Sequence, residues 1–189
     1  MTKNRPMARR TFLSRTATGA LAAAAAPAVR THAARVSVND KVRLAVFGTG
    51  GMGGRHIEAL ADNPQCTLVA LCDVAKSRYH ANLDKVEKMT GKRPQGYQDF
   101  RFVLDRDDID AVFVATPDHW HPLLTILGCQ AGKDVYVEKP VCTTVEEGRA
   151  MVEAARRYGR VVQVGTQQRS MPVFQKAMDV IHSGRIGQV

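Results

Sequence analysis

One stretch near the start of the chain restricts its fold more than any other, because an apolar run leads directly into closely spaced glycines: Leu44-Ala45-Val46-Phe47-Gly48-Thr49-Gly50-Gly51-Met52-Gly53. The apolar residues are typical of a buried β-strand. We expect Gly48 to allow a tight turn out of this strand, and Gly53 to let the following helix pack closely on the sheet. The stretch therefore predicts a strand, a turn and a helix in succession.

The glycines follow the spacing GxGxxG, which in a βαβ unit marks a turn that binds the pyrophosphate of a dinucleotide. Gly50 lets the backbone approach the phosphates, and the helix presents its free N–H groups and positive dipole end to the anion. A second apolar strand, residues 67–72, leads to Asp73, 20 residues after Gly53. A carboxylate at this spacing can accept hydrogen bonds from the adenosine ribose hydroxyls. The alternatives are a purely structural turn and a methyltransferase-like site for another nucleotide.

Strands and helices alternate along residues 41–189. Helices are expected at 51–63, 74–90, 100–104, 121–131, 145–158 and 172–184, and extended segments at 44–47, 67–72, 97–100, 109–115, 134–137 and 161–164. Thr143 and Thr144 stand three residues before Glu146 and Glu147, which is the spacing of a capping box, and Gly159 lies just past the end of that helix. With right-handed crossovers, this order predicts an α/β fold with a doubly wound parallel sheet, whose ligand lies beyond the carboxyl ends of the strands.

Charge and cysteine content exclude several classes of protein. The net charge of +9 depends largely on residues 1–34, which contain six basic and no acidic residues. The remaining basic excess is scattered and has little aromatic interleaving, so we expect no nucleic-acid binding. Four cysteines at irregular spacings predict neither a disulfide framework nor a zinc site. We expect Cys72 and Cys129 to be buried as small hydrophobic residues.

Residues 1–34 have the order of an export signal with a twin-arginine motif, followed by a linker. Arg9-Arg10-Thr11-Phe12-Leu13 precedes an alanine-rich run, residues 17–26, and then Ala26-Pro27-Ala28. We expect recognition by the twin-arginine export machinery, cleavage after Ala28 and a periplasmic location. The alanine-rich run is too short to form a permanent membrane span. The alternative is a disordered basic arm.

Unusual polar residues follow the later strands. These segments are Ala115-Thr116-Pro117-Asp118-His119-Trp120-His121, Glu138-Lys139-Pro140 and Gly165-Thr166-Gln167-Gln168-Arg169. Because the carboxyl ends of parallel strands share one edge of a sheet, we expect the segments to converge on one crevice. His119 and His121 lack a third ligand nearby, so no metal site is predicted. For the glutamines and Arg169, substrate or carboxamide contact and simple solvent exposure are both open.

The motifs in order, GTGGMG, ATPDHWH, AGKDVYVEKP and VVQVGTQQR, resemble the Gfo/Idh/MocA oxidoreductase family over residues 41–189. The resemblance implies a Rossmann domain that binds NAD, with NADP as the alternative, and a second α/β domain that is missing after Val189. It also implies oxidation of a sugar or polyol hydroxyl. Without the second domain we expect half an active site, and exposed apolar surface that favours a homo-oligomer.

The resemblance also assigns roles to individual residues. Lys139, Glu138 and His121 are the candidate catalytic residues. We expect the following to contact the cofactor: Gly48, Gly50, Gly51, Met52 and Gly53 at the pyrophosphate, Asp73 at the adenosine ribose, Thr116, Pro117 and His121 near the nicotinamide ribose, Glu138 and Lys139 at the nicotinamide and substrate, and Gln167.

Lys139 suits the chemistry, since a cation stabilises the alkoxide that develops as a hydroxyl is oxidised. Glu138 is expected to hold Lys139 in place, the alternative being a solvated ion pair. The resemblance further implies a cis peptide bond before Pro140. Asp73 would repel a 2′-phosphate and so favours NAD, whereas nearby Lys76 and Arg78 would allow NADP.

Three functions stay open at this point. The first is a periplasmic NAD(P)-dependent oxidoreductase acting on a sugar or polyol. The second is a glycoside hydrolase of the same family that uses tightly held NAD. The third is a cofactor-binding fragment without activity.

Overall fold

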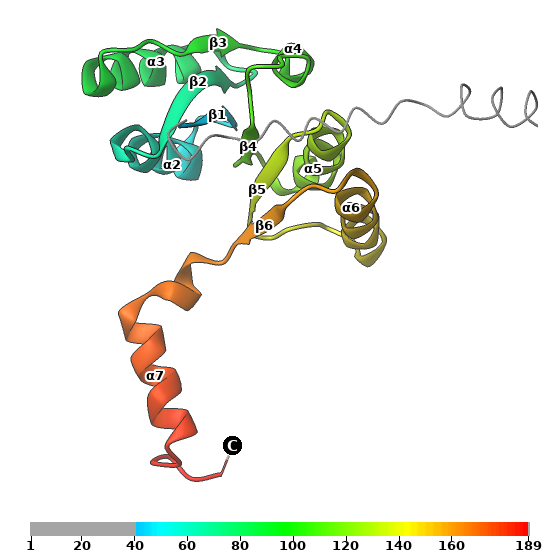
Figure 1. Cartoon of the computed structure of the whole chain (residues 1–189). Coiled ribbons are helices and arrows are strands. Elements are labelled where there is room, and N and C mark those ends of the chain that lie inside the picture. The colour runs from blue at the N-terminus through cyan, green and yellow to red at the C-terminus, as the bar shows by residue number, and fades with distance from the viewer. Residues whose placement is uncertain (1–40, 189) are drawn as a thin grey trace, which may run out of the picture. The chain divides into compact units, whose positions relative to one another are not determined.

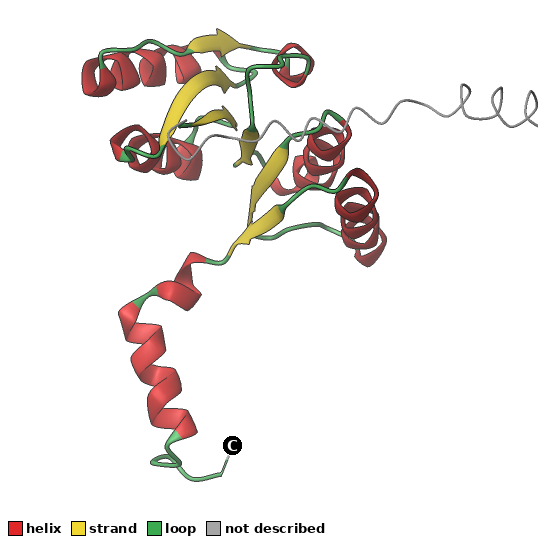
Figure 2. Cartoon of the chain, in the orientation of Figure 1, coloured by secondary structure: helices red, strands yellow, loops and turns green. Residues whose placement is uncertain are grey.

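A computed structural model describes residues 41–188 (Figures 1 and 2). The export signal, its cleavage site and the linker predicted for residues 1–34 lie outside this range. The elements are β1 Val42–Phe47, α2 Gly51–Asp62, β2 Cys66–Cys72, α3 Lys76–Thr90, β3 Gln95–Tyr97, α4 Phe100–Leu104, β4 Ala111–Val114, 3₁₀ helix η1 Asp118–Trp120, α5 His121–Gln130, β5 Asp134–Glu138, α6 Val145–Tyr158, β6 Val162–Gly165, 3₁₀ helix η2 Gln167–Ser170 and α7 Pro172–His182.

The six strands form one parallel sheet in the order β3-β2-β1-β4-β5-β6. The chain first builds outward from β1 through β2 to β3, then returns to the other side of β1 and continues through β4 to β6. This reversal makes the sheet doubly wound, and it confirms the predicted fold class. The reversal between β1 and β4 is also where such sheets bind ligands.

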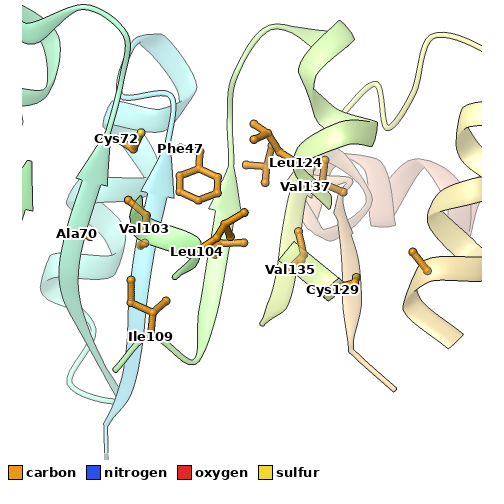
Figure 3. Close-up of a cluster of buried hydrophobic side chains, with 14 of the residues drawn as sticks. Phe47, Ala70, Cys72, Val103, Leu104, Ile109, Leu124, Cys129, Val135 and Val137 are labelled. Carbon is orange, nitrogen blue, oxygen red and sulfur yellow. The ribbon is translucent and has the colours of Figure 1, made fainter. Parts of the chain in front are cut away.

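Helices cover both faces of the sheet because successive side chains of each strand point to opposite faces. In β1, Leu44 and Val46 pack in a cluster with α2 and α3, whereas Ala45 and Phe47 pack in a second cluster with α4, α5 and α6 (Figure 3). The strand is therefore apolar throughout, as expected for a strand buried on both faces. Cys72 and Cys129 are buried in the second cluster and are free thiols, as predicted.

Helix α6 begins and ends as its sequence predicts. The Thr144 side chain accepts a hydrogen bond from the N–H of Glu147, and the Glu147 carboxylate accepts one from the N–H of Thr144. Gly159 ends the helix in the left-handed region, with φ of 60°. Local sequence signals therefore set both ends of this helix.

Some boundaries differ from the predictions. Helix α3 begins at Lys76 rather than Val74, because Asp73 Oδ1 accepts a hydrogen bond from the N–H of Ala75 at 3.0 Å and holds these residues in a turn. The 3₁₀ helices η1 and η2 were not predicted. Among residues 41–188, no helix has the length and apolarity needed to cross a bilayer.

Helix α7 has no buried residue. Large apolar side chains are exposed on it and beside it, namely Met171, Val173, Phe174 and Met178. Apolar side chains are therefore exposed on this segment; the second domain expected from the sequence stays a prediction.

The contact between β1 and α2 is the tightest backbone approach around the glycine turn. A Cβ atom added to Gly53 would lie 1.8 Å from the carbonyl oxygen of Gly48, so neither group can yield without moving backbone. We therefore expect Gly53→Ala to lower the free energy of unfolding by about 3 kcal/mol or more. Gly54→Ala is the matched control, since its Cβ would meet only the Thr49 carbonyl, at 3.8 Å. Urea unfolding of both variants checks this, and equal stabilities would contradict it.

At the amino-terminal ends of the strands, Asp110 accepts hydrogen bonds from the Arg43 backbone N–H at 2.8 Å and from the Arg43 guanidinium at 3.0 and 2.7 Å. The Arg43 side chain lowers the pKa of the Asp110 carboxyl. A lowered pKa stabilises the fold above the pKa of the unfolded chain, and this contribution is lost as the pH falls through the folded value.

We expect Asp110→Asn to lower the free energy of unfolding by about 1 kcal/mol at neutral pH. The difference from wild type should shrink as the pH falls below about 4, the ordinary pKa of an aspartate in the unfolded chain, and through the lowered pKa of Asp110 in the fold. Urea titrations monitored by circular dichroism across this range check the prediction. A difference that does not change with pH would contradict it.

Candidate cofactor site

A cavity of about 480 Å³ opens at the carboxyl ends of β1, β2, β4 and β5. Its size is typical of a small-molecule site, and it lies where the strand order reverses. The lining residues are Phe47, Gly48, Gly50, Gly51, Met52, Cys72, Asp73, Val74, Arg78, Gln98, Phe100, Ala115, Thr116, Pro117, Asp118, Trp120, His121, Leu124, Glu138 and Lys139.

The glycine turn forms one wall of this cavity. Gly48 has φ of 80°, and a Cβ there would lie 2.6 Å from the Ala115 carbonyl, so the turn passes directly against the loop after β4. Gly53 supports the turn from beneath and does not line the cavity. Helix α2 begins at this turn with neither a side-chain cap at Gly50 nor an acidic residue in its first turn. Its N-terminus is therefore suited to an anion.

Asp73 fixes the glycine turn as well as lining the cavity. Its Oδ2 accepts hydrogen bonds from the Thr49 N–H at 2.9 Å and the Thr49 hydroxyl at 3.2 Å, while Oδ1 accepts from Ala75. Because Oδ1 accepts only one of these hydrogen bonds, it retains a second lone pair for a ribose hydroxyl. The spacing from Gly53 predicted the ribose contact, but the bond to Thr49 was not foreseen.

Of the two basic residues expected near Asp73, the structure brings Arg78 to the cavity. Its Nη1 lies 3.2 Å from where a Cβ on Gly50 would be, so the guanidinium reaches over the glycine turn. Lys76 does not line the cavity. Arg78 thus places a positive charge beside the predicted pyrophosphate position.

Thr116 and Pro117 follow β4 and line the opposite wall. The Thr116 hydroxyl oxygen is buried and has no hydrogen-bond partner within residues 41–188. Buried hydroxyls are normally paired, so an unpaired one beside a cavity fits a polar ligand there.

His121 joins two loops around the cavity. Its Nδ1 lies 2.7 Å from the Pro140 carbonyl oxygen, and its Nε2 lies 2.9 Å from that of Thr116. The ring is only 1% exposed. Both ring nitrogens face backbone carbonyl oxygens, so the imidazole lies between the loops after β4 and β5.

Glu138 and Lys139 differ in exposure, although they are neighbours in sequence. Glu138 is the last residue of β5 and is 4% exposed, whereas Lys139 is exposed. Within the described residues their side chains form no ion pair. Glu138 was expected to hold Lys139 in place, and the contact that the structure shows is with the backbone: Glu138 Oε2 accepts a hydrogen bond from the Lys139 N–H at 3.1 Å. Lys139 itself lies just past the end of β5.

The Lys139–Pro140 peptide bond is cis, as the family resemblance implied. Gln167, in contrast, begins η2, is exposed and does not line the cavity; Gln168 and Arg169 are also exposed. Within residues 41–188, no group of three or more His, Cys, Asp or Glu side chains could hold a metal ion.

Cys72 lines the cavity but is unsuited to act as a nucleophile. Burial, with the charges of Asp73 and Asp99, raises the pKa of its thiol to about 12. The reactive form of cysteine is the thiolate, which is scarce at neutral pH when the pKa is that high. The site therefore does not provide thiolate chemistry.

Sequence analysis missed several residues of the site. Gln98 lies in the loop after β3 and Phe100 begins α4, and both line the cavity without any motif to mark them. Trp120, which belongs to the segment expected at the crevice, forms part of the wall and packs edge-on against Phe100, with ring centroids 6.1 Å apart. His56 was also missed, and its Nε2 lies 2.7 Å from Glu138 Oε1.

These features together define a dinucleotide-binding site: a glycine turn at a helix N-terminus, an acidic residue after the second strand and polar groups after β4 and β5. Comparison with known protein families agrees with this assignment of a dinucleotide-binding site. Residues 42–166 match the Gfo/Idh/MocA model, described as an oxidoreductase family with an NAD-binding Rossmann fold. The chain therefore belongs to this family, as its motifs predicted.

Individual relatives are similar over the same region. The oxidoreductase YrbE of Bacillus subtilis is 29% identical over 152 residues, covering 79% of this chain and 42% of that protein. A glycosyl hydrolase family 109 protein of Shewanella baltica is 34% identical over 122 residues, covering 62% of this chain and 27% of that protein. The chain thus spans less than half the length of these relatives.

A solved structure is similar to this chain over the same region. The scyllo-inositol dehydrogenase of Lactobacillus casei, with bound NAD(H) and scyllo-inositol, superposes with a TM-score of 0.67 at 25% identity. The match covers 78% of this chain and 43% of that protein. Residues 41–188 therefore have the fold of a domain that binds NAD.

Proposed function

We propose that this chain is the coenzyme-binding part of an NAD-dependent dehydrogenase that oxidises a hydroxyl of a sugar or polyol. The observation that carries the proposal is the cavity itself, which collects the glycine turn, Asp73 and Lys139 from three different strand ends. The relative solved with NAD(H) and scyllo-inositol supports the coenzyme and the substrate class.

Each part of the coenzyme has suitable protein groups. The amides at the start of α2 and the guanidinium of Arg78 would bind the pyrophosphate. Asp73 would accept hydrogen bonds from the adenosine ribose and disfavour a 2′-phosphate. The unpaired Thr116 hydroxyl would bind a polar group on the nicotinamide side. When bound, NAD supplies the group that accepts a hydride.

Lys139 is the best placed residue to act on the substrate. It lines the cavity and is exposed, so its ammonium can reach a bound hydroxyl. A cation there would stabilise the negative charge that develops on the oxygen during oxidation. Glu138 would act indirectly, by fixing the backbone of Lys139.

A second candidate is glycoside hydrolysis with NAD as a tightly held, recycled coenzyme. The similarity to the glycosyl hydrolase family 109 protein favours it. Release of sugar from a glycoside with no net formation of NADH would support this candidate. Steady formation of NADH from a polyol would support the dehydrogenase.

We also propose that the protein is exported through the twin-arginine route. The order of basic, apolar and small residues in 1–34 supports this. We expect the double replacement Arg9→Lys and Arg10→Lys to keep the protein in the cytoplasm, and N-terminal sequencing of exported protein to begin after Ala28. Equal export of the double variant, measured by cell fractionation, would contradict the route.

The coenzyme assignment is tested by calorimetry on the full chain with NAD and NADP. We expect wild-type protein to bind NAD more tightly than NADP. Asp73→Asn keeps the shape of the side chain but loses its charge, so we expect NAD affinity to fall about tenfold and the preference over NADP to narrow. Asp62→Asn, at the far end of α2, is the matched control and should leave both affinities unchanged.

Failure of folded wild-type protein to bind either coenzyme would overturn the proposed function. Assays with polyols on the same preparation then separate the remaining possibilities. Reduction of NAD shows a working dehydrogenase, whereas binding without turnover assigns the chain as a coenzyme-binding fragment.

A further inference from the structure

His56 is a partly buried polar residue that the proposed mechanism does not use. It lies on α2, one turn after Gly53, and its side chain is 18% exposed. The ring packs against Phe113 and Tyr136, with centroids 5.7 and 5.3 Å away. These neighbours come from β4 and β5, so the imidazole is inserted between the helix and the sheet and has a fixed orientation.

This orientation aims one ring nitrogen at Glu138. The distance from His56 Nε2 to Glu138 Oε1 is 2.7 Å, and the Glu138 side chain is 5% exposed. An ionised carboxylate only accepts hydrogen bonds, so the His56 ring donates through Nε2. The other carboxylate oxygen accepts from the Lys139 backbone N–H. A continuous chain of hydrogen bonds thus runs from α2 to the end of β5.

Glu138 is confined from a second direction. A Cβ on Gly165 of β6 would lie 3.0 Å from Glu138 Oε1 and 2.5 Å from the Tyr136 hydroxyl. The carboxylate therefore has little room to rotate away from His56. Holding it in this way also fixes the position of the Lys139 backbone, because that N–H is bound to the other oxygen.

The two ends of the chain of hydrogen bonds lie at different parts of the cavity. Helix α2 starts at the glycine turn, where the pyrophosphate would bind, while Lys139 lies where the nicotinamide and substrate would bind. We propose that His56 is a positioning residue that sets the place of Lys139, through Glu138, relative to the helix that binds the pyrophosphate. This inference rests on the proposed function.

A purely structural role makes a different prediction. A buried histidine that only satisfies a buried carboxylate would affect stability, and any loss of binding would be the same for every part of the coenzyme. If His56 positions Lys139, replacing His56 should weaken the binding of ligands that reach Lys139. The affinity for ligands that do not reach Lys139 should stay the same. ADP-ribose provides the comparison, since it contains the adenosine, the pyrophosphate and the second ribose but lacks the nicotinamide.

The experiment measures dissociation constants of NAD and ADP-ribose for the full chain by calorimetry. His56→Phe keeps a ring but removes the donor, so we expect NAD affinity to fall about tenfold while ADP-ribose affinity changes less than about twofold. In His56→Gln the amide nitrogen reaches as far as Nε2, and we expect it to restore most of the NAD affinity. His80→Phe, at an exposed position on α3, is the matched control and should change neither constant.

An unchanged ratio of the two constants in His56→Phe would overturn the inference, whether both affinities hold or both fall together. If this variant does not fold, His56→Asn serves instead, because its amide is too short to reach Glu138 and its polarity matches that of the glutamine. If the ratio of the NAD and ADP-ribose dissociation constants is the same in His56→Asn as in His56→Gln, the inference is again overturned. Wild-type protein that binds neither ligand would instead overturn the proposed function, and this inference with it.

Discussion

The structure depends on a contact that is possible only without side chains, between Gly53 at the start of α2 and the carbonyl of Gly48 at the end of β1. This contact brings the helix N-terminus to the edge of the sheet, and Asp73 fixes the intervening turn through Thr49. The close approach of Gly48 to Ala115 then sets the distance to the loop after β4. The positions of both walls of the cavity therefore depend on the same few backbone atoms.

Much of the fold could be predicted because its signals are local. The caps of α6 involve residues three positions apart, and the apolar strands are recognisable because both faces of the sheet are covered. The start of α3 was less predictable. It depends on a side chain, Asp73, that binds backbone in two directions at once, and propensity along the sequence does not record such a bond.

The site was predicted where residues lie at strand ends and missed where the contact is distant in sequence. His56 and Glu138 are 82 positions apart, and nothing near His56 in the sequence indicates its partner. Adjacency was misleading in the case of Glu138 and Lys139, because the contact joins the Glu138 carboxylate to the Lys139 backbone N–H and not to its ammonium. The order of motifs identified the family, but contacts in three dimensions were needed to assign what each residue holds.

The parallel sheet also places the residues of charged, stabilising contacts and the residues of the cavity at opposite ends of its strands. Its amino-terminal rim carries the pair Arg43–Asp110 and the buried Lys133, whose ammonium donates to the Arg106 carbonyl, while the cavity occupies the other rim. Electrostatic changes on the first rim are remote from the reacting groups. Selection for heat tolerance and selection for a new substrate can therefore proceed on different residues of the same strands.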